Sequence, residues 1–136
     1  TQITGDLWTE QKDPALPKET LALRLVGRKK DGALAPLASD ENSPVLLMGD
    51  SHTLVFHAGD DMLGTQAGLF DQLSNDLGFP IDLLGVRGSG ATTVRISLFR
   101  KAKQGDYLQK KKVIVWCLAA RDFTEASGGW RVVPIQ

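Results

Sequence analysis

One stretch of the sequence decides the fold, Val45-Leu46-Leu47-Met48-Gly49-Asp50-Ser51-His52. Its apolar residues follow a proline and stop at a glycine, which is typical of a short strand buried on both faces in the middle of a parallel sheet. Gly49 permits a sharp turn there, and Asp50 and Ser51 can cap a following helix, although all three residue types also suit a plain strand-to-helix turn. We expect Ser51 at the carboxyl edge of the sheet, where open α/β folds bind their ligands. A serine in that place is a candidate nucleophile.

The composition is that of an ordinary globular protein. The chain has 136 residues, of which 42% are apolar, enough for one domain with a real core. Its 16 basic and 16 acidic side chains cancel, so no overall field would draw it to nucleic acid or to an anionic membrane. Two histidines and one cysteine offer no metal-ligand spacing, and we expect no metal site. There is no pattern of a membrane span or a signal peptide, and the start at Thr1 suggests a processed or truncated piece.

The pattern predicts one domain over residues 1–136, with an irregular N-terminal segment over 1–43 and an α/β core over 44–136. In the first part we expect one strand over 20–26 and a hairpin through Asp31-Gly32. In the core we expect a helical turn or two over 51–58, a strand over 81–84, a buried strand with Cys117 over 113–118 and an edge strand over 130–135. Two amphipathic helices are expected, one over 65–77 with Leu69, Leu73 and Leu77, and one from Ala91 with Val94, Leu98 and Ala102. The whole is a small parallel sheet with flavodoxin-like winding and helices on both faces.

Three ends of predicted strands carry residues suited to chemistry. Because parallel strands joined by right-handed crossovers point their carboxyl ends the same way, we expect Ser51, the loop Gly88-Ser89-Gly90 and the end Ala119-Ala120-Arg121 to meet at one rim. Such a rim would combine a nucleophile, backbone N–H groups for an oxyanion, and an arginine for an anionic group. That combination suits acyl transfer and needs no dissociable cofactor.

These same residues resemble the SGNH (GDSL-type) hydrolase superfamily, and within it the SGNH domains of bacterial alginate O-acetyltransferases. The similarity runs from Ile3-Thr4-Gly5-Asp6-Leu7 to the end near Trp130, and its most specific parts are Leu46 to Ser51 and Val115 to Arg121. The resemblance implies an SGNH-like three-layer sandwich, incomplete at the N-terminus. It also implies that Ser51 takes an acetyl group and passes it to a polysaccharide hydroxyl. By the same resemblance, the N–H of Ser51 and the loop around Gly88, Ser89 and Gly90 form the oxyanion hole.

The sequence departs from this family at the catalytic base. A serine hydroxyl needs a positioned base, which by the resemblance is a histidine of an Asp-x-x-His motif near the C-terminus or of an Asp-x-His motif upstream of the serine. No histidine follows His57 and none precedes His52, so the expected base is missing. We expect the base to lie before Thr1 in a longer enzyme, so that residues 1–136 alone are close to inactive. The alternatives are a local substitute, His57 with Asp60 or Asp61, and a catalytically silent carbohydrate-binding or assembly module. His52 adjoins Ser51 and points away from it on a helix, which leaves it a structural or substrate-contacting role.

The resemblance also sets expectations for partners and location. We expect a polysaccharide such as alginate, or another carbohydrate, as substrate, an unidentified acetyl donor and no nucleic acid. A membrane-associated acetylation complex and a periplasmic or other extracytoplasmic location follow from the resemblance. Among the aromatic residues, Trp8 and Trp130 are the candidates for stacking on a sugar ring, and Trp116 is expected in the core.

Overall fold

A three-stranded parallel sheet forms the centre of the computed structural model, which describes residues 1–4, 15, 17–88 and 90–135. Its strands are β5 (Val45–Gly49), β6 (Asp82–Gly85) and β7 (Val113–Cys117), in the order β6-β5-β7. The chain passes from β5 to β6 on one side and then crosses to β7 on the other, so the strand order reverses at β5. The register places Gly49 beside both Gly85 and Cys117, which aligns the three carboxyl ends. The predicted α/β class with a small parallel sheet is confirmed.

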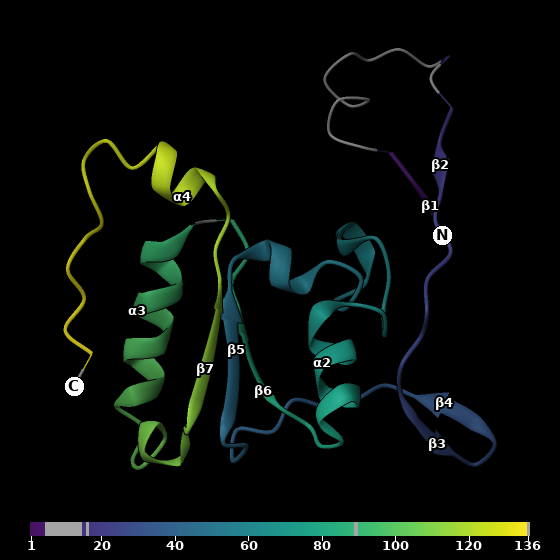
Figure 1. Ribbon diagram of the computed structural model, residues 1–136, viewed down its shortest axis with the longest axis horizontal. Coiled ribbons are helices and arrows are strands. Elements are labelled where there is room, and N and C mark those ends of the chain that lie inside the picture. The colour runs from purple at the N-terminus through teal and green to yellow at the C-terminus, as the bar shows by residue number, and fades with distance from the viewer. Residues whose placement is uncertain (5–14, 16, 89, 136) are drawn as a thin grey trace.

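One helix covers each face of this sheet (Figure 1). Helix α2 (Leu69–Leu77) packs over Leu47 on one face, and α3 (Ala91–Ala102) packs over Leu46 and Met48 on the other. Successive residues of β5 point to opposite faces, so a run of apolar residues serves both cores. The α3 side buries Leu46, Met48, Leu84, Val94, Leu98 and Tyr107, and the α2 side buries Leu47, Phe70 and Ile81.

The predicted apolar face of α2 is wrong in detail. Leu69 and Leu77 are 44% and 43% exposed, and the helix instead buries Phe70, Asp71 and Ser74. The carboxylate of Asp71 accepts a hydrogen bond of 3.1 Å from the N–H of Gly68, which caps the helix and explains its start at Leu69 rather than at 65. The helix ends at Gly78 with φ 77°, as the sequence indicates.

The remaining elements of the described chain are short and lie outside the central sheet. The expected strand over 20–26 is wrong, because only β2 (Glu19–Thr20) pairs, with β1 (Gln2–Ile3). The expected hairpin through Asp31-Gly32 is confirmed as β3 (Arg28–Lys30) and β4 (Ala33–Ala35), with positive φ at both turn residues. The remaining short elements are the 3-10 helices η1 (Ser51–Leu54), η2 (Asp60–Met62) and η3 (Leu108–Lys110), and helix α4 (Arg121–Thr124).

Strand β7 differs from the buried strand that the sequence predicts. It is at the edge of the sheet, and Val113, Ile114 and Val115 are 50%, 47% and 38% exposed. Cys117 is only half-buried. The edge strand expected over 130–135 does not form: Trp130 packs on Trp116 of β7 and on Arg95 of α3, and the segment makes no ladder with the sheet.

A buried polar cluster joins the amino ends of the strands. Asp82 is fully buried, and its Oδ2 lies 2.8 Å from Lys111 Nζ and accepts a hydrogen bond of 2.6 Å from Tyr107. The Lys111 ammonium also donates to the carbonyls of Glu41 and Ser43. Burial raises the pKa of Asp82, but the bonds from Lys111 and Tyr107 outweigh it, so this pKa lies below its ordinary value. Burial, and then the bond to Asp82, raises the pKa of Tyr107 well above its usual range.

No helix in the described part of the chain has the length and the apolar character needed to cross a membrane.

Candidate functional site

The glycines at the strand ends place Ser51. A Cβ added at Gly49 would lie 2.4 Å from Thr53 Cγ2, and one added at Gly85 would lie 2.3 Å from Leu54 Cδ2. Helix η1 therefore sits directly on the carboxyl ends of β5 and β6, closer than any other residue type would allow. As its first residue, Ser51 lies at the point where the strand order reverses, the position predicted from the sequence.

Asp50 fixes the start of η1. Its side chain is buried and accepts a hydrogen bond of 2.9 Å from the N–H of His52, while its backbone carbonyl accepts one of 2.6 Å from the Thr53 hydroxyl. The same carboxylate oxygen lies 3.0 Å from Nδ1 of His52. The other oxygen, Oδ2, is buried and has no hydrogen-bond partner within the described residues. Asp50 thus holds the turn and leaves one buried acceptor unused beside Ser51.

Ser51 is half-buried and opens into a surface cavity of about 370 Å³. Within the part of the chain that the structure describes, neither its hydroxyl nor its backbone N–H has a hydrogen-bond partner. Both groups are therefore available to a bound molecule. The cavity is lined by Ile3, Thr4, Ser51, His52, Val55, Asp61, Met62 and Leu63.

Neither histidine of the chain hydrogen-bonds to Ser51. The His52 side chain is 59% exposed, and its Nδ1 is engaged by Asp50. His57 turns toward α2, where its Nδ1 lies 3.0 Å from Asp71 Oδ2 and its ring packs 4.6 Å from that of Phe70. The local substitute, His57 with Asp60 or Asp61, is therefore not formed, because the carboxylate bound to His57 is that of Asp71.

Gly90 and Arg121 line a second cavity, of about 290 Å³, at the start of α3. A Cβ on Gly90 would lie 2.0 Å from Asp122 Oδ1, which accepts a hydrogen bond of 3.0 Å from the N–H of Ala91. Because Gly90 has no side chain, the Asp122 carboxylate can approach closely enough to cap α3. Asp122 Oδ2 is buried and has no partner within the described residues. The ring of Trp130 packs against Trp116, Phe123 and Arg95, is partly exposed, and lines this second cavity.

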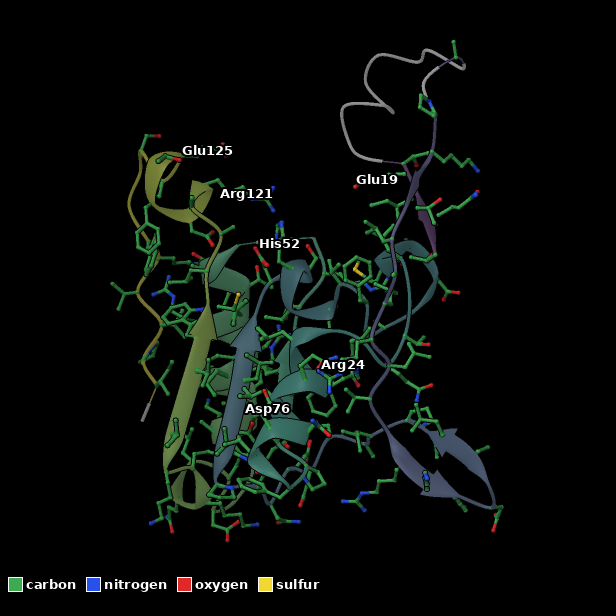
Figure 2. The ribbon with its side chains drawn as sticks, turned by 45° about the vertical axis from the view of Figure 1, so that its right-hand side comes forward. Glu19, Arg24, His52, Asp76, Arg121 and Glu125 are labelled. Carbon is green, nitrogen blue, oxygen red and sulfur yellow. The ribbon has the colours of Figure 1, made fainter. Side chains whose placement is uncertain are left out.

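The predicted convergence of strand ends is met in part. Figure 2 shows Arg121 and His52 at the same end of the sheet, but the residues divide between the two cavities, Ser51 and His52 in one and Gly90 and Arg121 in the other. Gly88 is exposed with φ 79°, and Ser89 lies outside the described residues. Trp8 lies outside them as well.

Two residues at this end of the sheet, Arg87 and Asp122, were missed by sequence reasoning. Arg87 pairs with Asp61, which links the loop after β6 to the wall of the Ser51 cavity. Asp122 caps α3 from α4. Each of these contacts joins residues at least 26 positions apart, and the only local signal was an acidic or basic residue directly after a strand.

Over residues 1–4, 15, 17–88 and 90–135, no group of three or more histidine, cysteine or acidic side chains could hold a metal ion. Comparison of the chain with protein-family models, with curated proteins and with solved structures finds no match.

Proposed function

We propose that the chain carries the nucleophile of an SGNH-type O-acyl transferase or esterase that acts on a carbohydrate, with Ser51 as the residue that takes the acyl group. This proposal rests on the hydrogen bonding of two groups of Ser51, its hydroxyl and its backbone N–H. Its hydroxyl and its N–H have no partner within the described residues, and they face a cavity at the reversal point of the sheet. The strand order β6-β5-β7 also corresponds to the first three strands of flavodoxin-like winding, as the resemblance requires.

The proposed reaction has two steps. The Ser51 Oγ attacks the carbonyl carbon of an acetyl ester, its proton passes to a base, and the alcohol of the donor leaves as the ester bond breaks. A sugar hydroxyl or water then attacks the acetyl carbon and releases Ser51, which takes back a proton. The N–H of Ser51 is the donor that faces the negative oxygen of the intermediate, whereas Gly90, in the loop that the resemblance makes the second donor, lines the other cavity.

The base of this reaction is not a histidine of residues 1–136. The carboxylates of Asp50 and Asp71 contact only Nδ1 of His52 and His57, and neither ring makes a hydrogen bond to the Ser51 hydroxyl in this arrangement. We infer that the base comes from outside these residues. The carbohydrate substrate and an extracytoplasmic acetylation complex are part of the same proposal and follow from the resemblance alone.

Chemical rescue tests this function on the chain as it is. The chain is incubated with 4-nitrophenyl acetate and imidazole, which can enter the open cavity and act as the missing base, and peptide mass spectrometry then locates the acetyl group. We expect acetyl on Ser51, none at that position in Ser51→Ala, and unchanged acetylation in His52→Gln. Absence of acetyl from Ser51 in a folded protein would remove this residue from the mechanism and favour the silent binding module.

A further inference from the structure

Apolar side chains form much of the wall of the Ser51 cavity. Among the described residues that line it, four are aliphatic or thioether side chains from separate parts of the chain: Ile3 of β1, Val55 after η1, and Met62 and Leu63 at the end of η2. Each of the four is half-buried and lines the cavity, so part of its apolar surface is open to a ligand. Pockets for small molecules are typically concave and mostly apolar, with a few polar groups. This wall therefore has the character of a binding pocket for an apolar group.

Hydrogen bonds hold this wall in place. The N–H of Phe56 donates to the carbonyl of Met62 at 2.7 Å, and the N–H of Met62 donates to the carbonyl of Gly59 at 2.8 Å. The Thr1 hydroxyl donates to the carbonyl of Leu63 at 3.3 Å. Leu63 has φ 70°, which is uncommon for a bulky residue and persists only where the surrounding structure imposes it. The wall is therefore formed before a ligand arrives.

The polar part of the lining does not oppose an apolar ligand. The carboxylate of Asp61 is paired with Arg87, and Nδ1 of His52 lies against Asp50. None of the described residues that line the cavity is a tryptophan, tyrosine or phenylalanine, so the cavity offers a sugar ring no such face to pack on. An alkyl chain needs no hydrogen-bond partner, whereas the hydroxyls of a buried sugar do. The lining therefore suits an alkyl chain better than a sugar ring.

Covalent attachment fixes where an acyl chain would lie. In the function proposed above, on which this inference rests, the chain begins at a carbonyl carbon bonded to Ser51 Oγ, which opens into this cavity. An acetyl group adds only one methyl beyond that carbon and leaves most of the apolar wall uncovered. We propose that the wall binds the alkyl chain of an acyl group longer than acetyl, such as butyryl or hexanoyl. The bonds that form and break are those of the acetyl reaction, and only the alkyl chain differs.

The size of the expected preference follows from the burial of methylene groups. A methylene that moves from water onto an apolar wall, and is bound there in the transition state, speeds acylation by about fourfold. Two added methylenes, from acetate to butyrate, should therefore raise the rate at Ser51 by about 15-fold when both are fully buried. A serine without an apolar wall should show no such rise.

The first test compares 4-nitrophenyl acetate, butyrate and hexanoate as acyl donors in the presence of imidazole. Peptide mass spectrometry measures the acylation rate at Ser51 and at Ser127, an exposed serine that corrects for the different reactivity of the three esters. We expect the Ser51-to-Ser127 ratio to rise about fourfold per methylene from acetate to butyrate. A ratio that stays constant or falls, with acetyl still found on Ser51, would overturn this inference and leave the proposed function standing. Absence of every acyl group from Ser51 in the folded protein would overturn both.

The second test removes part of the wall and keeps the turn that carries it. Because asparagine adopts positive φ more readily than leucine, Leu63→Asn should preserve the backbone at φ 70°. We expect the butyrate-to-acetate ratio at Ser51 to fall toward the ratio at Ser127 in this variant. Leu77→Asn is the matched control, because Leu77 is 43% exposed at the end of α2 and does not line the cavity, and it should keep the wild-type ratio. A wild-type ratio in both variants would contradict the placement of the chain on this wall.

Discussion

The two ends of the sheet hold buried carboxylates under opposite conditions. At the amino end, Asp82 has an ammonium and a phenol hydroxyl bound to it. At the carboxyl end, Asp50 and Asp122 each keep one buried oxygen without a partner within the described residues. A buried acceptor without a bond costs free energy, so proteins retain one mainly where it serves a purpose. The comparison teaches that the amino end satisfies its buried carboxylate, whereas the carboxyl end leaves buried acceptors open beside Ser51, which supports the proposal that chemistry takes place there.

The largest expected effect is loss of the buried ion pair. Lys111→Met leaves the carboxylate of Asp82 buried without its counter-ion, and we expect the free energy of unfolding to fall by about 3–5 kcal/mol. Urea denaturation measures this change. The matched control is Lys112→Met, at the exposed neighbouring lysine, which should change stability by less than about 0.5 kcal/mol. Equal effects of the two variants would show that the amino end is not stabilised by this pair.

Alkaline pH should weaken the same end of the sheet. Because the pKa of Tyr107 is raised on folding, its contribution is complete below the unfolded pKa of about 10 and is lost as pH rises above it. One such group lowers the unfolding free energy by up to about 1.4 kcal/mol per pH unit there. Denaturation between neutral and alkaline pH should show this fall in the wild type and a smaller one in Tyr107→Phe. An identical slope in both proteins would refute the assignment.

Acid pH should also lower the free energy of unfolding, through Asp82. Its pKa is lowered on folding, so the stability that it contributes is present above the unfolded pKa of about 4 and is lost as pH falls through the folded value. Asp82→Asn should flatten this acid limb of the stability curve. A limb unchanged by the substitution would place the acid sensitivity in other carboxylates.

A smaller effect is expected from the cap at the carboxyl end. Asp50→Ala removes the acceptor for the His52 N–H, and loss of such a cap costs about 1 kcal/mol. The same change frees the turn that carries Ser51, so acetylation of Ser51 should slow as well. Thermal unfolding and peptide mass spectrometry measure the two effects. Full acetylation in this variant would show that the turn does not need its cap.

The smallest effect on stability is expected from Ser51→Ala. The hydroxyl has no partner within the described residues, so its removal should change the unfolding free energy by less than about 0.5 kcal/mol. A larger loss, measured by urea denaturation, would mean that Ser51 serves the fold and would weaken the contrast between the two ends.

Local sequence patterns predicted the parallel strands and the place of Ser51. An apolar run that stops at Gly49 identifies a central strand, and a serine after it must lie at the carboxyl edge. The buried face of α2 was predicted wrongly. Phe70 and Ser74 are four residues apart, as are Leu69 and Leu73, so the spacing alone cannot show which of the two pairs faces the sheet.

The rest depended on contacts between distant residues. Asp82 and Lys111 are 29 positions apart, and nothing in either neighbourhood marks them as a pair. The exposure of β7 could not be predicted either, since an apolar strand reads as buried whether or not a second strand lies beside it. No local pattern shows that Ser51 and Arg121 line two different cavities.

The most direct test of the account compares the rate of acetylation by 4-nitrophenyl acetate at Ser51 with that at Ser127, an exposed serine, as imidazole is added. If Ser51 is a placed nucleophile that lacks only its base, its rate should rise with imidazole far more steeply than the rate at Ser127. Parallel slopes at the two serines would show that Ser51 is an ordinary surface hydroxyl and would contradict the central claim.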